Sequence, residues 1–137
     1  MIRGINHITL SVGDMERSIR FYVDVLGFEQ LMESEGASYF LAGNLWFCVV
    51  QESVEEGARR PDDYSHIAFD IDQDDYPAMA TRIAESGAKV FKENITEGDS
   101  LYFLDPDGHK LEIHCGSWQS RMEAVRHDPW GDVKFFR

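Results

Sequence analysis

Three side chains that can bind a metal interrupt otherwise apolar, strand-like segments of the sequence. They are His7, His66 and Glu112. Because successive side chains of a strand point to opposite faces, each of them would lie opposite a row of apolar residues. Two imidazoles and one carboxylate suit Zn²⁺, Mn²⁺ or Fe²⁺ and leave coordination positions open. A cation with open positions acts as a Lewis acid on a substrate oxygen, so the pattern predicts a substrate-binding metal site.

A purely structural role for these residues is the competing interpretation. A single strand histidine is more often hydrogen-bonded than a ligand, and the three positions fit no local metal motif such as HExxH. His114 shares a strand face with Glu112 and is either a fourth ligand or a partner of one. We expect His109 and His127, which lie in turn and tail sequence, to be solvated.

The polar segment 92–100 is a second candidate site. Its oxygens and its glycine can surround a monovalent cation, or its Lys92, Thr96 and Ser100 can face an anion. An ordinary solvent loop would have the same composition. Next along the chain, the segment 105–108 (DPDG) reads as a turn, whose composition backbone geometry explains.

The chain repeats one order of elements. We expect strands at 5–12, 28–32, 39–41 and 45–50 with a helix at 15–26, and then strands at 65–71, 89–92, 100–104 and 110–114 with a helix at 76–85. Asp14 is the expected cap of the first helix, while Gly27 and Gly87 end the two helices. The period of about 60 residues indicates duplication.

The repeat predicts an α+β fold of two βαβββ units within one domain, residues 1–137. Module 1 covers about residues 1–52 and module 2 about 63–116, and a C-terminal tail, 117–137, begins as a helix near Trp118. The polar segment 51–63 is the expected linker. One such unit is too small to be stable alone, so the two should pack together or pair with another chain.

The acidic charge of the chain argues against polyanionic partners. The formal net charge of −12 disfavours nucleic acid and anionic membranes, and no apolar run is long enough to span a bilayer. No secretory signal is visible at the N-terminus. The two cysteines, Cys48 and Cys115, lie in apolar runs and are expected to be buried and reduced. We therefore expect a cytoplasmic protein.

Three stretches carry a resemblance to known proteins: HITL at 7–10, DYSHIAF at 63–69 and EGDSLYFLDPDGHKLEIH at 97–114. With them the chain resembles, over nearly its whole length, the fosfomycin-resistance proteins of the vicinal-oxygen-chelate (glyoxalase) superfamily, in particular the glutathione-dependent FosA class. The YFLDPDGHKLE portion is shared with glyoxalase I and ring-cleaving dioxygenases. The EGDS motif and Arg121 are more specific to the resistance proteins.

The resemblance implies a role for each site residue. The paired modules would form a domain-swapped homodimer with a metal site shared between subunits. The implied Mn²⁺ ligands are His7, His66 and Glu112, and the implied K⁺ ligands are Asn94, Gly98 and Ser100. The phosphonate would be held by Tyr64, Lys92, Thr96, Ser100, Tyr102 and Arg121, with Thr9 near the epoxide oxygen and Tyr39 and Trp46 bordering the substrate or thiol site. Thr9, Tyr102 and Arg121 are thereby the catalytic candidates.

The implied activity is the metal-dependent transfer of glutathione to the epoxide of fosfomycin. Two departures from the family pattern bear on it: Thr96 replaces a common serine, and the stretch 31–38 (LMESEGAS) differs from the tryptophan-bearing stretch common in the FosA class. Thr9 differs from the cysteine of bacillithiol-using relatives. Glu33 or Glu35 leaves open a hydrolase that uses water. A glyoxalase-like lyase and a non-enzymatic drug-binding protein also stay open as functions.

Overall fold

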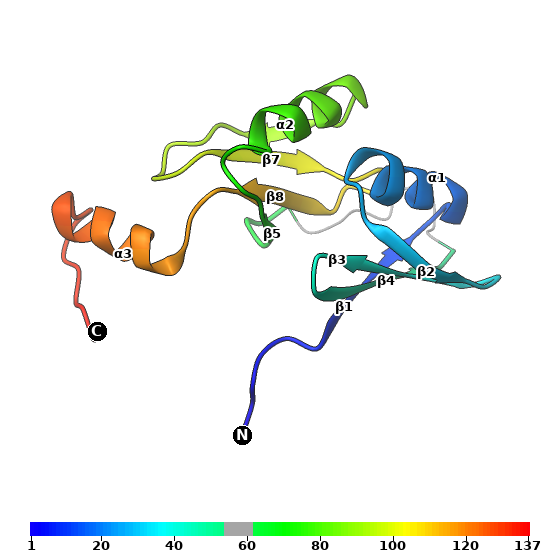
Figure 1. Ribbon diagram of the computed structural model, residues 1–137, viewed down its shortest axis with the longest axis horizontal. Helices are drawn as coiled ribbons and strands as arrows, with labels where there is room; N and C mark the ends of the chain where they lie inside the picture. The colour runs from blue at the N-terminus through cyan, green and yellow to red at the C-terminus, as the bar shows by residue number, and fades with distance from the viewer. Residues whose placement is uncertain (54–61) are drawn as a thin grey trace.

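The computed structural model describes residues 1–53 and 62–137 and contains two four-stranded sheets (Figure 1). Sheet A has the order β1-β4-β3-β2 and consists of β1 (His7–Val12), β2 (Glu29–Glu33), β3 (Ala37–Ala42) and β4 (Leu45–Gln51). Sheet B has the order β5-β8-β7-β6 and consists of β5 (Ile67–Asp70), β6 (Val90–Lys92), β7 (Ser100–Leu104) and β8 (Lys110–His114).

The two sheets repeat one topology. In each, the first strand pairs in parallel with the last, and the remaining pairs are antiparallel. The predicted α+β fold of two βαβββ units is therefore confirmed. The strands are shorter than predicted at 5–12 and 65–71, so that His66 lies just before β5. Most of the predicted linker, residues 54–61, lies outside the described residues.

Helices follow the first strand of each sheet and also form the tail. They are α1 (Met15–Arg20), the π-helical turn η1 (Phe21–Val25), α2 (Tyr76–Glu85) and α3 (Trp118–His127). Asp14 caps α1 as predicted, because its Oδ1 accepts the backbone N–H of Arg17 at 3.0 Å. The predicted helix 15–26 has the expected extent, but its second half is π-helical rather than α-helical. Of the helices in the described part of the chain, none is both long and apolar enough to cross a membrane.

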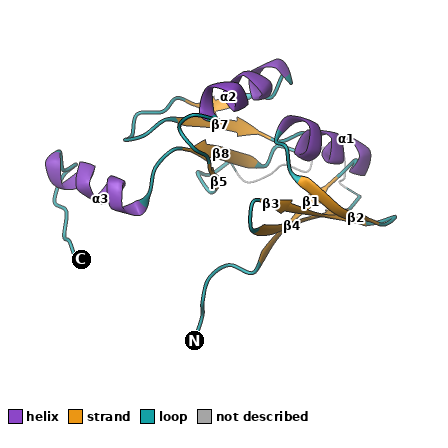
Figure 2. Ribbon diagram, viewed as in Figure 1, coloured by secondary structure: helices purple, strands orange, loops and turns teal. Residues whose placement is uncertain are grey.

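The core lies between the helices and one face of each sheet. Figure 2 shows α1 and α2 on the same side of the two sheets, whereas α3 lies apart from both. The largest fully buried side chains are Tyr22, Phe40, Phe47, Phe103, Ile83 and Leu111. Phe28 and Phe69 join the modules, with ring centroids 5.3 Å apart.

The turn between β7 and β8 also fastens module 2 to module 1. Asp105 Oδ2 accepts the Tyr22 hydroxyl at 2.7 Å, and Asp107 Oδ1 accepts the backbone N–H of Gly13 at 2.8 Å. His109 Nε2 donates to the carbonyl oxygen of Ser11 at 2.7 Å. The expectation that backbone geometry alone explains this turn was wrong, as was the solvated placement of His109, because both depend on a neighbour about 90 residues away in sequence.

Candidate metal and anion site

The outer face of sheet B gathers polar side chains from β6, β7 and β8 and from the segment just before β5. The register aligns Ala68 of β5 with Glu112 of β8, Glu112 with Tyr102 of β7, and Tyr102 with Lys92 of β6. Aligned residues of neighbouring strands lie on the same face. We call the following set the sheet B half-site: Tyr64, His66, Lys92, Thr96, Ser100, Tyr102, Glu112 and Arg121.

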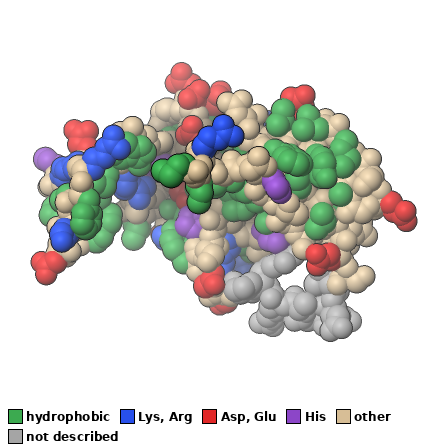
Figure 3. Space-filling model, turned by 90° about the horizontal axis from the view of Figure 1, so that it is seen from below, with side chains coloured by type: hydrophobic (Ala, Val, Ile, Leu, Met, Phe, Trp, Pro, Cys, Tyr) green, Lys and Arg blue, Asp and Glu red, His purple; other side chains and the backbone are tan. Residues whose placement is uncertain are grey.

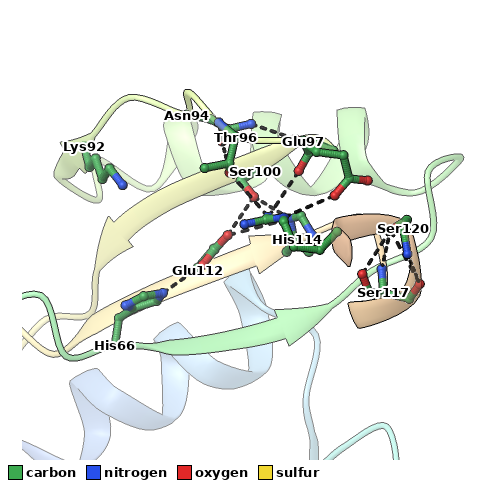
Figure 4. A network of polar contacts seen from close by, with 12 residues as sticks. His66, Lys92, Asn94, Thr96, Glu97, Ser100, Glu112, His114, Ser117 and Ser120 are labelled. Carbon is green, nitrogen blue, oxygen red and sulfur yellow. Dashed lines mark hydrogen bonds and ion pairs between the residues drawn. The ribbon is translucent and has the colours of Figure 1, made fainter. Parts of the chain in front are cut away.

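Glu112 lies at the centre of this half-site and has both carboxylate oxygens occupied (Figure 4). Its Oε2 lies 2.9 Å from His66 Nε2, and its Oε1 accepts the Ser100 hydroxyl at 2.6 Å. The same hydroxyl lies 2.6 Å from His114 Nδ1, so it accepts a hydrogen from that ring while it donates to the carboxylate. His114 is thus a partner of the candidate ligand through Ser100. Glu112 is 5% exposed, so a polar network this complete fixes its position.

The His66–Glu112 pair has the donor chemistry of a metal site. His66 Nδ1 lies 2.7 Å from the backbone oxygen of Tyr64, which only accepts hydrogen bonds, so Nδ1 carries the hydrogen. This leaves Nε2 as the ring nitrogen that faces Glu112, with 2.9 Å between Nε2 and Oε2. A ligating histidine typically has its second ring nitrogen fixed in this way. The residues therefore fit a divalent cation between His66 Nε2 and Glu112.

The cation of Lys92 lies among tyrosines. Its Nζ donates to the Tyr64 hydroxyl at 2.7 Å and lies 4.3 Å and 5.0 Å from the ring centroids of Tyr64 and Tyr102. The hydrogen bond from Lys92 lowers the pKa of Tyr64. Burial raises the pKa of Tyr102 to about 12, with further contributions from Tyr64 and Glu112. Tyr102 therefore keeps its proton at neutral pH and can donate a hydrogen bond to an anion.

The loop between β6 and β7, residues 93–99, is braced by Asn94. Its Nδ2 donates to the carbonyl of Gly98 at 2.7 Å, and its Oδ1 accepts both the backbone N–H and the hydroxyl of Thr96, at 3.0 Å and 2.9 Å. Gly98 has φ +80°, and an added Cβ would lie 2.3 Å from the carbonyl oxygen of Cys115. Asn94, Gly98 and Ser100 offer carbonyl and hydroxyl oxygens of the kind that suit a monovalent cation.

Arg121 reaches this loop from the first turns of α3. Ser117 caps α3 by accepting the backbone N–H of Ser120 at 3.1 Å, which fixes the direction of the helix. The Arg121 guanidinium then contacts Thr96 and Glu97. Figure 3 shows basic side chains gathered toward the end of the molecule that holds α3, and histidines near the middle of the same face.

Sheet A carries a smaller set of candidate residues, which we call the sheet A half-site: His7, Thr9, Tyr39 and Trp46. The register aligns His7 with Trp46, and both Thr9 and Tyr39 with Cys48. His7 stacks on Trp46 with ring centroids 4.5 Å apart, and its Nδ1 lies 2.7 Å from Asn6 Oδ1. Trp46 Nε1 is a buried donor without a partner, the only such side-chain atom found among the described residues.

The structure brings together the predicted ligands of sheet B but not His7. His66 and Glu112 are in contact on sheet B, whereas His7 lies on β1, the edge strand of sheet A. Over residues 1–53 and 62–137, no group of three His, Cys, Asp or Glu side chains is placed to hold one metal ion. The phosphonate candidates of module 2 do gather on one face.

Comparison with known proteins identifies the family. Residues 4–113 match the model of the Glyoxalase/Bleomycin resistance protein/Dioxygenase superfamily. The chain is 35% identical over 136 residues to the glutathione transferase FosA of Serratia marcescens, with 98% of this chain and 96% of that protein covered. It belongs to the fosfomycin-resistance proteins. The metallothiol transferase FosB of Staphylococcus haemolyticus is 39% identical over 129 residues, which cover 92% of this chain and 93% of that protein.

Solved structures of fosfomycin-resistance proteins have the same fold. FosX from Mesorhizobium loti has a TM-score of 0.76 and 35% identity, with 89% of this chain and 99% of that one covered. A point mutant of FosX from Listeria monocytogenes, solved with Mn(II) and 1S,2S-dihydroxypropylphosphonic acid, has a TM-score of 0.78 and 32% identity, with 90% and 98% covered. A divalent metal, Mn(II), is thus bound in the structure of a related member of this family.

Two features of the site were not predicted from the sequence. The placement of Ser100 at the phosphonate and the potassium ion stays a prediction, whereas the link that its hydroxyl makes between Glu112 and His114 was not predicted. Glu97 was given no role, although its carboxylate pairs with Arg121. The alternation of β8 already placed Glu112 and His114 on one face, so the sequence did indicate that these two side chains could share a partner. The second contact depends on the path of the chain between β8 and α3.

Proposed function

We propose that the protein is a Mn²⁺- and K⁺-dependent transferase that adds glutathione to the epoxide of fosfomycin. The observation that carries the proposal is the sheet B half-site. There the His66–Glu112 pair lies on the same face as Lys92 and Tyr102, and Arg121 contacts the loop 93–99 beside them. The identity of 35% with a glutathione transferase over 98% of the chain supports the choice of thiol. Two free cysteines fit a cytoplasmic enzyme that works beside reduced glutathione.

His66 and Glu112, with His7, would hold the divalent metal, and Asn94, Gly98 and Ser100 would hold potassium. When bound, the divalent cation supplies Lewis acidity that weakens the bond between the epoxide oxygen and its carbon. Lys92 and Arg121 offset the charge of the phosphonate and fix its orientation. Tyr102, which keeps its proton, donates a hydrogen bond to it, and Thr96 lies beside Arg121 to do the same.

The bond changes need no nucleophile from the protein. The glutathione thiolate attacks an epoxide carbon opposite the departing oxygen, so that the S–C bond forms as the C–O bond breaks, and the oxygen then takes a proton. Both cysteines of the protein are buried, and burial raises the pKa of Cys48 and of Cys115. They are therefore protonated at neutral pH and are poor nucleophiles.

We place the third ligand on a second copy of the chain. His7 is exposed on β1, and both β1 and β5 are edge strands of their sheets. Joining module 1 of one subunit to module 2 of its partner would bring His7 and Thr9 to the sheet B half-site, with Tyr39 and Trp46 bordering the thiol. It would also cover both edges, which otherwise invite unspecific pairing. Each chain would still form one domain, which consists of module 1 (residues 1–52), module 2 (residues 63–116) and the tail (residues 117–137).

A hydrolase that uses water is the second candidate. The solved relatives include FosX with a dihydroxypropylphosphonic acid, a diol, and Glu33 of this chain lies in sheet A, on β2. A drug-binding protein without activity is less consistent with the His66–Glu112 pair, because sequestration needs no Lewis acid.

The deciding experiment is a ³¹P NMR and mass-spectrometric assay of the protein with Mn²⁺, K⁺ and fosfomycin, with and without glutathione. We expect a glutathione adduct that is lost in Glu112→Gln and kept in Glu85→Gln, an exposed residue of α2 that serves as control. A diol formed without thiol would make the protein a hydrolase. Unchanged fosfomycin under every condition would contradict both activities.

A further inference from the structure

The guanidinium of Arg121 is already paired with a carboxylate of its own chain. Its Nε donates to Glu97 Oε2 at 3.3 Å, and its Nη2 lies 3.2 Å from the backbone oxygen of Glu97 and 3.4 Å from Thr96 Oγ1. The side chains of Arg121 and Glu97 are 33% and 29% exposed, so a dissolved anion can reach the pair. The site that would bind a phosphonate thus contains an internal anion.

We propose that Glu97 is a built-in competitor of the substrate anion for Arg121. The inference rests on the proposed function only in that it places the anionic group of the substrate at Arg121. The carboxylate of Glu97 holds the guanidinium in the unliganded protein, and a tetrahedral dianion displaces it. The affinity of the site for any such anion is therefore lower than its cations alone would give.

The contact geometry favours displacement. Charge-assisted hydrogen bonds between guanidinium and carboxylate are commonly about 2.7–2.9 Å long, and strong pairs use two parallel N–H groups. The Glu97 carboxylate uses one N–H of Arg121, at 3.3 Å. A phosphonate or phosphate can accept two parallel N–H bonds from the same guanidinium. The exchange therefore replaces a long single contact by a shorter double one.

The other cation of the site differs in this respect. Lys92 Nζ contacts the hydroxyl of Tyr64 and two aromatic rings, all uncharged as long as the phenols keep their protons. In the part of the chain that the structure describes, no carboxylate forms an ion pair with Lys92. Among the described residues, competition of this kind is therefore found at Arg121 and not at Lys92. It would limit occupation of the site by free phosphate and favour a ligand that makes further contacts near Glu112.

The proposal is tested by isothermal titration calorimetry with methylphosphonate at a pH at which it is a dianion, using the full-length protein in MnCl₂ and KCl. Glu97→Gln keeps an oxygen acceptor but removes the charge, and we expect it to tighten binding roughly two- to fivefold. Glu93→Gln is the matched control, since Glu93 lies exposed in the same loop; its affinity should equal that of the unmodified protein. Equal or weaker binding by Glu97→Gln overturns the proposal.

A double variant separates competition from a general charge effect. In the Arg121→Ala background, the gain from Glu97→Gln should disappear, because there is no guanidinium to release. An undiminished gain there overturns the proposal. The assay with fosfomycin is run on the same preparations. Turnover without a Glu97 effect would remove this inference alone, and a Glu97 effect without turnover would remove the proposed function alone.

Discussion

In module 1 the row Thr9, Cys48 and Tyr39 crosses β1, β4 and β3, and in module 2 the row Ala68, Glu112 and Tyr102 crosses β5, β8 and β7. The rows occupy the same register of the same topology, and each ends on a tyrosine. At the middle position, module 1 has a buried thiol and module 2 has a buried carboxylate. The repeated fold thus holds equivalent positions, and only module 2 has a candidate carboxylate ligand at the middle one.

The hairpin loop of module 2 also carries more polar contacts than the hairpin loop of module 1. β2 and β3 are joined by residues 34–36, whereas β6 and β7 are joined by the longer loop 93–99. In the shorter loop, the Ser34 hydroxyl donates to the carbonyl oxygen of Ala37 at 3.3 Å. The longer loop has more side-chain bonds, from Asn94 to Gly98 and Thr96, and a contact from α3 through Arg121. Module 2 therefore concentrates the polar chemistry, while module 1 provides His7 and an aromatic surface. Within the described residues, neither half-site holds three His, Cys, Asp or Glu side chains placed for one metal ion.

The largest expected effect tests the middle position of the two rows. Glu112→Gln should lower kcat/KM by more than about 100-fold, because even residues that only support metal ligands commonly contribute 10–100-fold. Cys48→Ala, the equivalent change in module 1, should leave manganese affinity unchanged. Free Mn²⁺ is measured by electron paramagnetic resonance, and turnover by ³¹P NMR. Tight manganese binding by Glu112→Gln would show that the carboxylate is not a ligand.

Mixed dimers test whether the half-sites meet across subunits. His7→Ala and Glu112→Ala chains should each be inactive alone. After co-expression, a heterodimer has one site with both defects and one intact site, so about a quarter of the parent activity should return if the subunits mix randomly. Activity is measured on the mixture and on each variant alone. No recovery, although mass spectrometry detects heterodimers, would mean that each chain builds its own site.

The strand and helix pattern was predictable from the sequence because it depends on local periodicity. Alternation placed the strands, and Asp14 and Gly27 marked the limits of the first helix. The alternation also put His66 and Glu112 opposite the core. The π-helical form of residues 21–25 was not predictable, since it accompanies the burial of Phe21 and Tyr22 in the packed core.

Contacts between distant segments were beyond reach of the same reasoning. Asp107 accepts the N–H of Gly13, and Arg121 contacts Glu97, only because of how complete modules and α3 pack. A turn motif such as DPDG satisfies its own backbone rules in any surroundings, so its composition does not reveal that its carboxylates also join two modules.

The loop comparison predicts a difference in stability between two glycine variants. Gly98→Ala should lower the free energy of unfolding by about 2–3 kcal/mol, because φ is +80° and the new Cβ would meet the Cys115 carbonyl oxygen at 2.3 Å and His114 Cε1 at 2.9 Å. Gly36→Ala, in the corresponding loop of module 1, meets nothing within 4 Å and should change it by less than about 0.5 kcal/mol. Urea unfolding measures both. Equal stability of the two variants would contradict a rigid loop 93–99.

The smallest expected effect concerns the tyrosines that flank Lys92. Lys92→Met removes the ammonium group that stabilises the Tyr64 phenolate, so the pKa of Tyr64 should rise toward the ordinary tyrosine value. Tyr102 should still titrate near pH 12, because burial is the main cause of its shift. Absorbance at 295 nm follows the titration, and Tyr64→Phe identifies which transition belongs to Tyr64. An unchanged first transition in Lys92→Met would mean that the cation does not face Tyr64 in solution, which would leave it free to meet the substrate anion directly.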